Sequence, residues 1–229
     1  MSPHKNLTRQ LAAMGTLALA TTAWAEAPMA TDDAGTLEKG GTKVEGQWSR
    51  EGQTRGLGLA VAHSPIEKLE AEISLGRSTD RSGSPHVSNR ITGLALKWVP
   101  ISIGKTTIGV KVDRSTEKPD NANRARSSSV RGLYTLRMES GQALHANLGR
   151  SSSTDSAGVS TMATVWSLGA EQPVSGAVTL VGDWFGESRN SPGYLLGARW
   201  TVREGLKLSA AFGRSQGQSL GRAFATWEF

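Results

Sequence analysis

Apolar and charged side chains alternate with a period of two along most of the chain, and this pattern restricts the possible folds most strongly. In the segment 68–77, Leu69 and Ile73 fall on one parity, whereas Glu70 and Glu72 fall on the other. Successive side chains of a β-strand point to opposite faces. The pattern therefore predicts strands with one apolar face and one charged face.

Turn residues divide the chain into twelve such segments, most of them as long as a tilted membrane-spanning strand. We predict strands at 42–50, 55–63, 68–77, 90–99, 105–114, 126–138, 142–150, 159–172, 177–187, 193–202, 206–214 and 221–229.

The connections alternate between short and long. Short ones lie at 64–67, 100–104, 139–141, 174–176 and 203–205, and longer polar ones at 80–89, 116–125, 152–158 and 188–192. The hairpins at 51–54 and 215–220 are shorter exceptions. Membrane barrels have short periplasmic turns and long outer loops. A soluble β-sandwich also shows alternation, but it does not require this order.

The free-energy cost of placing charged side chains in lipid decides which face of the strands the charged set occupies. A Lys or Arg at the bilayer midplane costs about 2–4 kcal/mol, so we expect this parity to face a lumen and the apolar parity, which includes Leu75, Val110, Leu148 and Leu208, to face lipid. The expected lumen-lining residues are Lys43, Glu45, Glu70, Glu72, Lys97, Lys111, Asp113, Arg131, Arg137, His145, Glu171, Asp183, Arg199, Lys207, Arg222 and Glu228. The predicted fold class is all-β, a transmembrane antiparallel up-and-down β-barrel of about twelve strands over residues 42–229.

The lumenal set holds eight basic and seven acidic residues besides His145, so strong ion selectivity is not predicted. Opposed charges could narrow a pore or line a solute path, and the sequence leaves an open and an occluded lumen as alternatives. Phe185 and Phe224 also fall on the lumenal parity, either as packing residues or as contacts for a solute.

The N-terminus reads as an export signal. Lys5 and Arg9 precede the apolar run 11–23, and Ala23-Trp24-Ala25 fits a cleavage site, which predicts a cut after Ala25 and leaves 26–41 ahead of the first strand. The alternative is a retained anchor, but the run is short for a spanning helix. The predicted location is the bacterial outer membrane. The chain has no cysteine, which excludes a disulfide framework.

The last segment, 221–229, is an alternating strand that ends on an aromatic residue. Trp227 and Phe229 share its lipid face, where an aromatic girdle would meet headgroups. This ending resembles the terminal strand of bacterial outer-membrane barrels. The resemblance implies that Trp227 and Phe229 form an assembly signal for the barrel-assembly machinery.

A second resemblance lies ahead of the first strand, in Pro28-Met29-Ala30-Thr31-Asp32-Asp33-Ala34-Gly35. With Gly40 and Glu45, this segment is similar to the start of a family of outer-membrane proteins described as transporters of the meta-pathway for phenol degradation. The resemblance implies passage of small, often aromatic or hydrophobic, solutes. Residues 26–41 are then either a flexible acidic periplasmic lead-in or a lumenal plug.

Arginines gather on the lipid parity at the predicted outer ends of the strands. This arginine belt comprises Arg50, Arg55, Arg77, Arg90, Arg114, Arg126, Arg150 and Arg214. The arginine fork suits phosphate, so we expect the belt to face lipopolysaccharide phosphates at the edge of the outer-membrane lipid. Ordinary snorkelling is the alternative.

Outer-membrane phospholipases are also twelve-stranded barrels, but they use a Ser–His pair on the outer wall. Of the histidines here, His63 lies at the periplasmic end, His86 in a loop and His145 on the lumenal parity. None stands in a convincing nucleophile–base arrangement. We therefore predict a channel or transporter-like barrel, or a closed structural or surface-interaction barrel, rather than an enzyme. No cofactor, metal or nucleic-acid partner is predicted.

Overall fold

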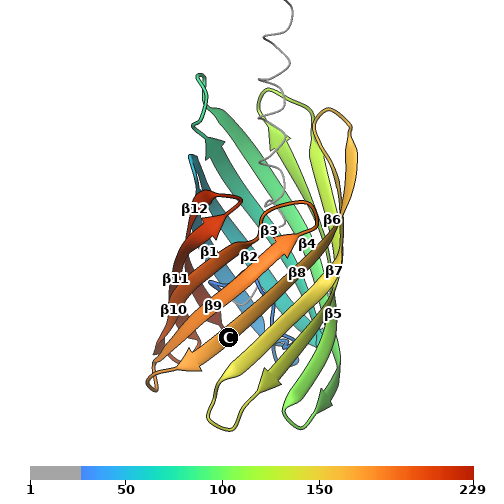
Figure 1. The fold of residues 1–229 in the computed structure, drawn as a ribbon. Helices are drawn as coiled ribbons and strands as arrows, with labels where there is room; N and C mark the ends of the chain where they lie inside the picture. The colour runs from blue at the N-terminus through green and yellow to red at the C-terminus, as the bar shows by residue number, and fades with distance from the viewer. Residues whose placement is uncertain (1–26) are drawn as a thin grey trace, which may run out of the picture.

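Each strand pairs antiparallel with the next in sequence, and the last pairs with the first, so that the sheet closes on itself (Figure 1). The computed structural model describes residues 27–229; the predicted signal and its cleavage site lie outside the described residues. The strands are β1 Thr42–Glu51, β2 Thr54–Ile66, β3 Leu69–Asp80, β4 Val87–Ile103, β5 Thr106–Pro119, β6 Ala125–Arg137, β7 Ala143–Thr154, β8 Ser160–Pro173, β9 Val178–Glu187, β10 Gly193–Arg203, β11 Leu206–Ser215 and β12 Gln218–Glu228.

The predicted fold class is confirmed, with every predicted strand present in the described residues. Several strands are longer than predicted at the long-loop end. For example, β3 continues to Asp80 and β5 to Pro119. Both faces of a strand can be polar once it projects beyond lipid. The alternation therefore fades there, while the backbone ladder continues, as in the pairing of Asn89 with Pro119.

The surface is inverted relative to that of a soluble protein. Leu75 and Leu148 on the outer wall are 58% and 64% exposed, whereas Lys111 and Asp113 inside are buried. A wide apolar exterior around a polar interior is the arrangement of a membrane barrel. No helix among residues 27–229 is long and apolar enough to cross a membrane.

The seam between the two ends of the sheet is fully paired. In the register of β1 with β12, Lys43 lies opposite Glu228 and Glu51 opposite Leu220. Beyond β12, Phe229 exchanges two backbone hydrogen bonds with Thr42, at 2.7 and 2.9 Å. The barrel therefore has no free strand edge along this seam.

Candidate functional site: a segment bound inside the barrel

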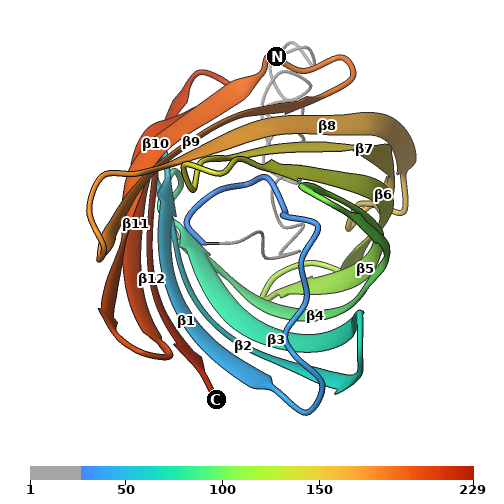
Figure 2. The same ribbon diagram turned by 90° about the horizontal axis from the view of Figure 1, so that it is seen from below.

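The chain ahead of β1 lies inside the barrel and crosses its interior (Figure 2). This N-terminal segment, residues 27–41, is fastened near β1 by two backbone hydrogen bonds. Gly40 N–H donates to the Ser64 carbonyl at 2.7 Å, and Ser64 N–H donates to the Gly41 carbonyl at 3.1 Å. Gly40 has a φ of 84°, a left-handed conformation that glycine adopts without strain.

Backbone amides of the N-terminal segment are hydrogen-bonded by lumenal side chains. The Asp183 carboxylate accepts from Ala30 N–H and, at 2.9 Å, from Thr31 N–H. Thr135 Oγ1 accepts from Ala34 N–H at 2.8 Å. A loop without secondary structure can be buried only when its polar groups are paired in this way. The segment is therefore specifically bound.

Asp32 is fully buried and lies between two cations. Its Oδ1 lies 2.8 Å from Lys111 Nζ, and its Oδ2 lies 3.1 Å from an Arg131 guanidinium nitrogen. The Asn147 amide bonds both sides of the Asp32 backbone: its oxygen accepts from Asp32 N–H at 2.8 Å, and its nitrogen donates to the Asp32 carbonyl at 2.9 Å. The barrel wall thus binds this residue through both its charge and its peptide groups.

Asp33 makes a second pair of ionic contacts, 3.3 Å from Lys97 and 3.2 Å from Arg137. Burial alone would raise the pKa of the Asp33 carboxyl, but Lys97 and Arg137 outweigh burial and hold that pKa well below its ordinary value. The bound segment therefore favours the ionised carboxylate.

Three of the four cations that contact Asp32 and Asp33 lie side by side on neighbouring strands. Lys97 on β4 is the register partner of Lys111 on β5, and Lys111 is the partner of Arg131 on β6. We call these three residues the cation row. Like charges directly opposite one another destabilise a sheet, so the row needs anions. The N-terminal segment supplies two of them.

Two glycines of the wall provide space for this arrangement. A Cβ on residue 169 would lie 3.0 Å from the Thr31 Cβ, so Gly169 leaves room for the segment. A Cβ on residue 149 would lie 2.7 Å from the Arg131 Cγ, so Gly149 leaves room for the Arg131 side chain to lie over β7. The interior surface is therefore shaped to its occupant.

Apolar contacts complete the packing of the segment. Ala30 packs against a buried apolar patch on β9–β12, formed by Phe185, Leu195, Ala211 and Leu220. Ala27 contacts a second cluster that contains Phe224. Both lumenal phenylalanines thus serve as packing residues while the segment is bound.

A further ion-pair group lies beside the start of the segment. Arg199 donates to both oxygens of Glu171, each at 3.2 Å, and to the Ala27 carbonyl at 2.9 Å. His145 Nε2 lies 3.5 Å from the same carboxylate, and its Nδ1 lies 2.9 Å from Thr135 Oγ1. These residues connect the segment to β6, β7, β8 and β10.

A small cavity lies beside the segment, lined by Ala27, Lys43, Glu45, Arg199 and Lys207 among others, with a volume of about 20 Å³. That volume has room for roughly one water molecule.

The other predicted lumenal residues also lie inside or at the rim. Glu45 accepts from Thr226 at 2.7 Å, Glu70 accepts from Leu37 N–H at 3.1 Å, and Lys207 pairs with Glu228 at 3.1 Å. Glu72 is buried, Asp113 is paired with Arg131, and Arg222 is partly buried, whereas Arg137 is half-exposed. Asn147 and Thr135 bind the segment but were not predicted, because uncharged lumenal residues gave no distinguishing signal.

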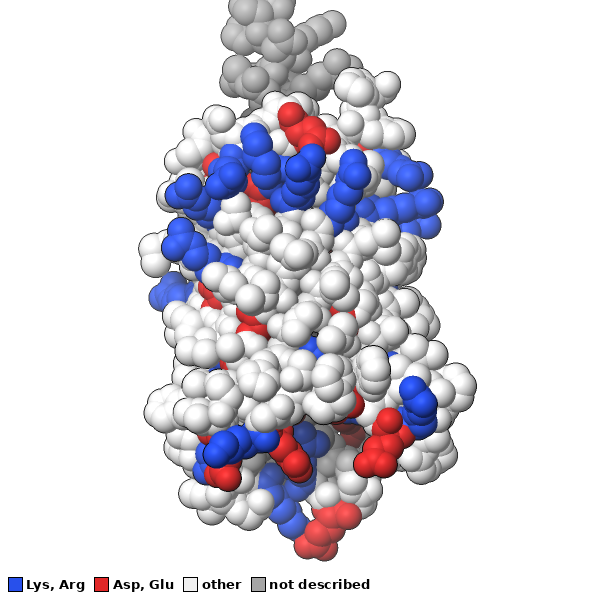
Figure 3. Space-filling view, turned by 180° about the vertical axis from the view of Figure 1, so that it is seen from behind, with Lys and Arg blue, Asp and Glu red and all other residues white. Residues whose placement is uncertain are grey.

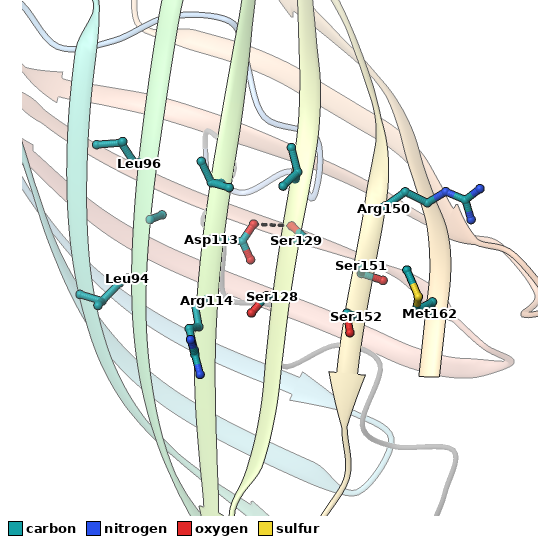
Figure 4. Close-up of a pocket in the computed structure, with 13 residues that line it drawn as sticks. Leu94, Leu96, Asp113, Arg114, Ser128, Ser129, Arg150, Ser151, Ser152 and Met162 are labelled. Atoms are coloured by element: carbon teal, nitrogen blue, oxygen red, sulfur yellow. Dashed lines mark hydrogen bonds between the residues drawn. The ribbon is translucent and has the colours of Figure 1, made fainter. Parts of the chain in front are cut away.

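The arginine belt is exposed on the outer wall. All eight of its side chains are exposed, and a row of basic residues crosses the upper part of the face in Figure 3. Beside Arg114 and Arg150 lies an outer groove of about 520 Å³, lined by Leu94, Val130 and Met162 among others (Figure 4).

The histidines outside the lumen have simpler surroundings. His63 Nδ1 lies 3.1 Å from the Thr42 hydroxyl, and His86 is exposed in the β3–β4 loop. Across residues 27–229, no cluster of three His, Cys, Asp or Glu residues is placed to hold a metal ion.

Solved structures with the same fold are outer-membrane barrels. The COG4313 outer membrane channel from Pseudomonas putida F1 matches with a TM-score of 0.65 and 11% identity over 86% of this chain and 98% of that chain. The KdgM porin matches with a TM-score of 0.61 and 8% identity, over 82% of this chain and 99% of that chain. The translocator domain of autotransporter NalP from Neisseria meningitidis matches with a TM-score of 0.52 and 12% identity, over 82% of this chain and 87% of that chain.

These identities establish the fold alone. No family model and no curated protein matches the chain. The family resemblance of the segment around Thr31-Asp32-Asp33-Ala34 therefore remains a prediction.

Proposed function

We propose that the protein is an outer-membrane channel for small solutes, and that its own N-terminal segment closes it. The observation that carries this proposal is the burial of Asp32 between Lys111 and Arg131, inside a barrel whose outer wall is apolar. Solutes pass when the segment leaves the lumen or shifts within it. The structure, with the segment bound inside the barrel, then represents the closed state of a gated path.

The contacts of the segment suit a reversible gate. They are hydrogen bonds and ion pairs rather than a covalent link. Water can hydrogen-bond each of these polar groups once the segment is released. A buried ion pair contributes little net free energy, because desolvation offsets its attraction. Hydration of Asp32 and the cation row can therefore offset much of the cost of release.

The alternative is a permanently closed structural or surface-interaction barrel. The same contacts of the N-terminal segment support this alternative, if the segment is a fixed core that never leaves the barrel. The glycines that make room for the segment fit both functions. Conduction distinguishes them, because a fixed core stays non-conducting when single contacts are weakened.

The family resemblance adds small aromatic or hydrophobic solutes to this proposal. Among the structurally similar barrels, the KdgM porin has been solved in complex with disordered oligogalacturonate. In the present chain, the lumen combines charged residues with the buried apolar patch around Phe185. A purely hydrophobic solute would use only part of this wall.

The outer wall supports a separate proposal about membrane contacts. We propose that the arginine belt binds lipopolysaccharide phosphates and fixes the depth of the barrel. Arg114 and Arg150 flank the groove formed with Leu94, Val130 and Met162, so a phosphate and an apolar chain would have adjacent contacts. The proposed location is the outer membrane, after export and cleavage behind Ala25.

Single-channel recording tests the channel proposal. Asp32→Ala/Asp33→Ala should conduct more often than the wild type, because both ionic contacts of the segment are lost. Asp120→Ala, which removes an exposed loop carboxylate, is the matched control and should behave as the wild type. If neither the wild type nor the folded double variant conducts, the closed-barrel alternative is correct.

A further inference from the structure

The N-terminal segment places an anionic and an apolar group on two different surfaces of the lumen. Ala30 packs on the apolar patch of Phe185, Leu195, Ala211 and Leu220. Two residues later, Asp32 places its carboxylate on Lys111 and Arg131. The same short stretch therefore covers an apolar surface and a cationic one.

We propose that these two surfaces form the solute site of the channel, and that the segment occupies it as a built-in competitor. The solute is a small carboxylate with an apolar body, such as an aromatic acid. This inference rests on the proposed channel function and specifies its substrate class. The carboxylate of the solute takes the place of the Asp32 side chain, and the apolar part of the solute takes the place of Ala30.

The cation row supports an anion rather than a cation or a neutral solute. Lys97, Lys111 and Arg131 are consecutive register partners at one level of the wall. When the segment leaves, the row loses the carboxylates of Asp32 and Asp33, while its like charges stay on adjacent strands, where they repel one another. A carboxylate that enters relieves this repulsion, as Asp32 does in the bound state.

Neighbouring acids limit the charge that the site accepts. Glu70 is the register partner of Lys97, and Asp113 lies 3.2 Å from Arg131. Glu72 is buried two residues after Glu70, on the same face of β3. With these acids present, the row suits one or two carboxylates and not a long polyanion.

The wall also has groups that orient such a ligand. Asn147 presents an amide oxygen and an amide nitrogen beside the Asp32 position, and Ser167 donates to that oxygen at 3.1 Å. Arginine and lysine provide charge-assisted hydrogen bonds, the stronger class for carboxylates. The apolar patch lies on β9–β12 and the cation row on β4–β6, but Ala30 and Asp32, only two residues apart, contact one surface each. An amphiphilic acid that spans these two positions can therefore contact both.

The test uses the full chain with Asp32→Ala/Asp33→Ala, which empties the carboxylate positions. Purified protein is titrated with sodium benzoate at fixed ionic strength, with calorimetry and thermal unfolding as readouts. We expect saturable benzoate binding and a rise in melting temperature. Acetate should bind more weakly, because it lacks the apolar body, and neutral benzamide should give neither effect. Wild-type protein should bind benzoate at least about tenfold more weakly, because Asp32 competes.

Two further variants test the assignment of the site. In the same background, Lys111→Gln should weaken benzoate binding by about tenfold or more, the usual scale of a lost charged hydrogen bond. Lys105→Gln, at an exposed turn next to β5, should leave it unchanged. Benzoate binding no better than benzamide, or equal binding in wild type and variant, would overturn the inference. A barrel that binds benzoate but never conducts would instead overturn the channel function.

Discussion

Lys111 and Asp32 are 79 positions apart in the chain, and their charged atoms lie 2.8 Å apart inside the barrel, with both side chains almost completely buried. This contact joins the middle of the sheet to a segment that belongs to no strand. It makes the N-terminal segment part of the folded interior.

Replacing Lys111 with Met should destabilise the bound state. Loss of one partner of a buried ion pair costs about 3–5 kcal/mol, and Arg131 retains part of the interaction with Asp32, so we expect about 3 kcal/mol. Urea unfolding in lipid vesicles measures this. Lys105→Met is the control, because its pair with Glu139 is exposed and contributes about 0–1 kcal/mol. Equal effects of the two variants would contradict the account.

Low pH should release the segment through Asp33, which lies in the N-terminal segment and not in a spanning strand. Its pKa is lowered in the bound state by Lys97 and Arg137, although burial opposes the shift. A depressed pKa stabilises the bound state above the ordinary value of 3.8, and this stability is lost as the pH falls below 3.8. Conductance should therefore be constant from neutral pH to about pH 5 and should rise only in stronger acid.

Asp33→Asn is the control for this pH dependence. The variant should conduct more often at neutral pH and should show a weaker rise in acid, because its amide does not titrate. A wild-type channel that opens near pH 6, or an unchanged acid response in Asp33→Asn, would argue against control by this carboxylate.

The sequence predicted the wall of the barrel better than its contents. Leu75 and Glu72 could be assigned to opposite faces because parity alone fixes the face. Strand ends such as Pro119 were missed because alternation stops where lipid stops. The near-neutral sum of lumenal charges concealed the cation row, because the row exists only once the register brings Lys97, Lys111 and Arg131 together.

The position of the N-terminal segment could not be derived from its sequence. Asp32 and Asp33 are equally consistent with a solvated lead-in. The groups that bind them lie far away in the chain, from Lys97, 64 positions from Asp33, to Asn147, 115 positions from Asp32. Their convergence depends on closure of the sheet, which no local pattern encodes.

Deleting Phe229 should impair assembly, in keeping with the proposed assembly signal of Trp227 and Phe229. The two rings are 5.1 Å apart, and Phe229 closes the seam against Thr42. We expect a smaller heat-modifiable, folded fraction in membranes. Phe212→Ala removes an exposed aromatic ring away from the seam and should assemble normally. Assembly of the deletion variant at the wild-type level across expression levels would count against the proposal.

Replacing Arg77, Arg114, Arg150 and Arg214 with Gln should reduce lipopolysaccharide co-purification. Melting temperature should fall in lipopolysaccharide-containing bilayers but not in phosphate-free detergent, because only the former offers phosphates to the arginine fork. Replacement of the exposed Lys68, Lys105 and Arg203 at the short-turn end provides the control. Equal losses in both media would mean that the arginines act through folding alone.

A cysteine lock tests most directly whether the N-terminal segment is the gate. The chain has no native cysteine, and a Cβ at residue 169 would lie 3.0 Å from that of residue 31. A disulfide has a Cβ–Cβ distance of roughly 3.5–4.5 Å, so Thr31→Cys/Gly169→Cys needs only a small shift to cross-link. Conductance is recorded before and after dithiothreitol, with the single-cysteine variants as controls. We predict a silent oxidised protein that conducts once reduced, and controls that do not respond. Equal conductance in the oxidised and reduced states would show that the N-terminal segment does not gate the channel.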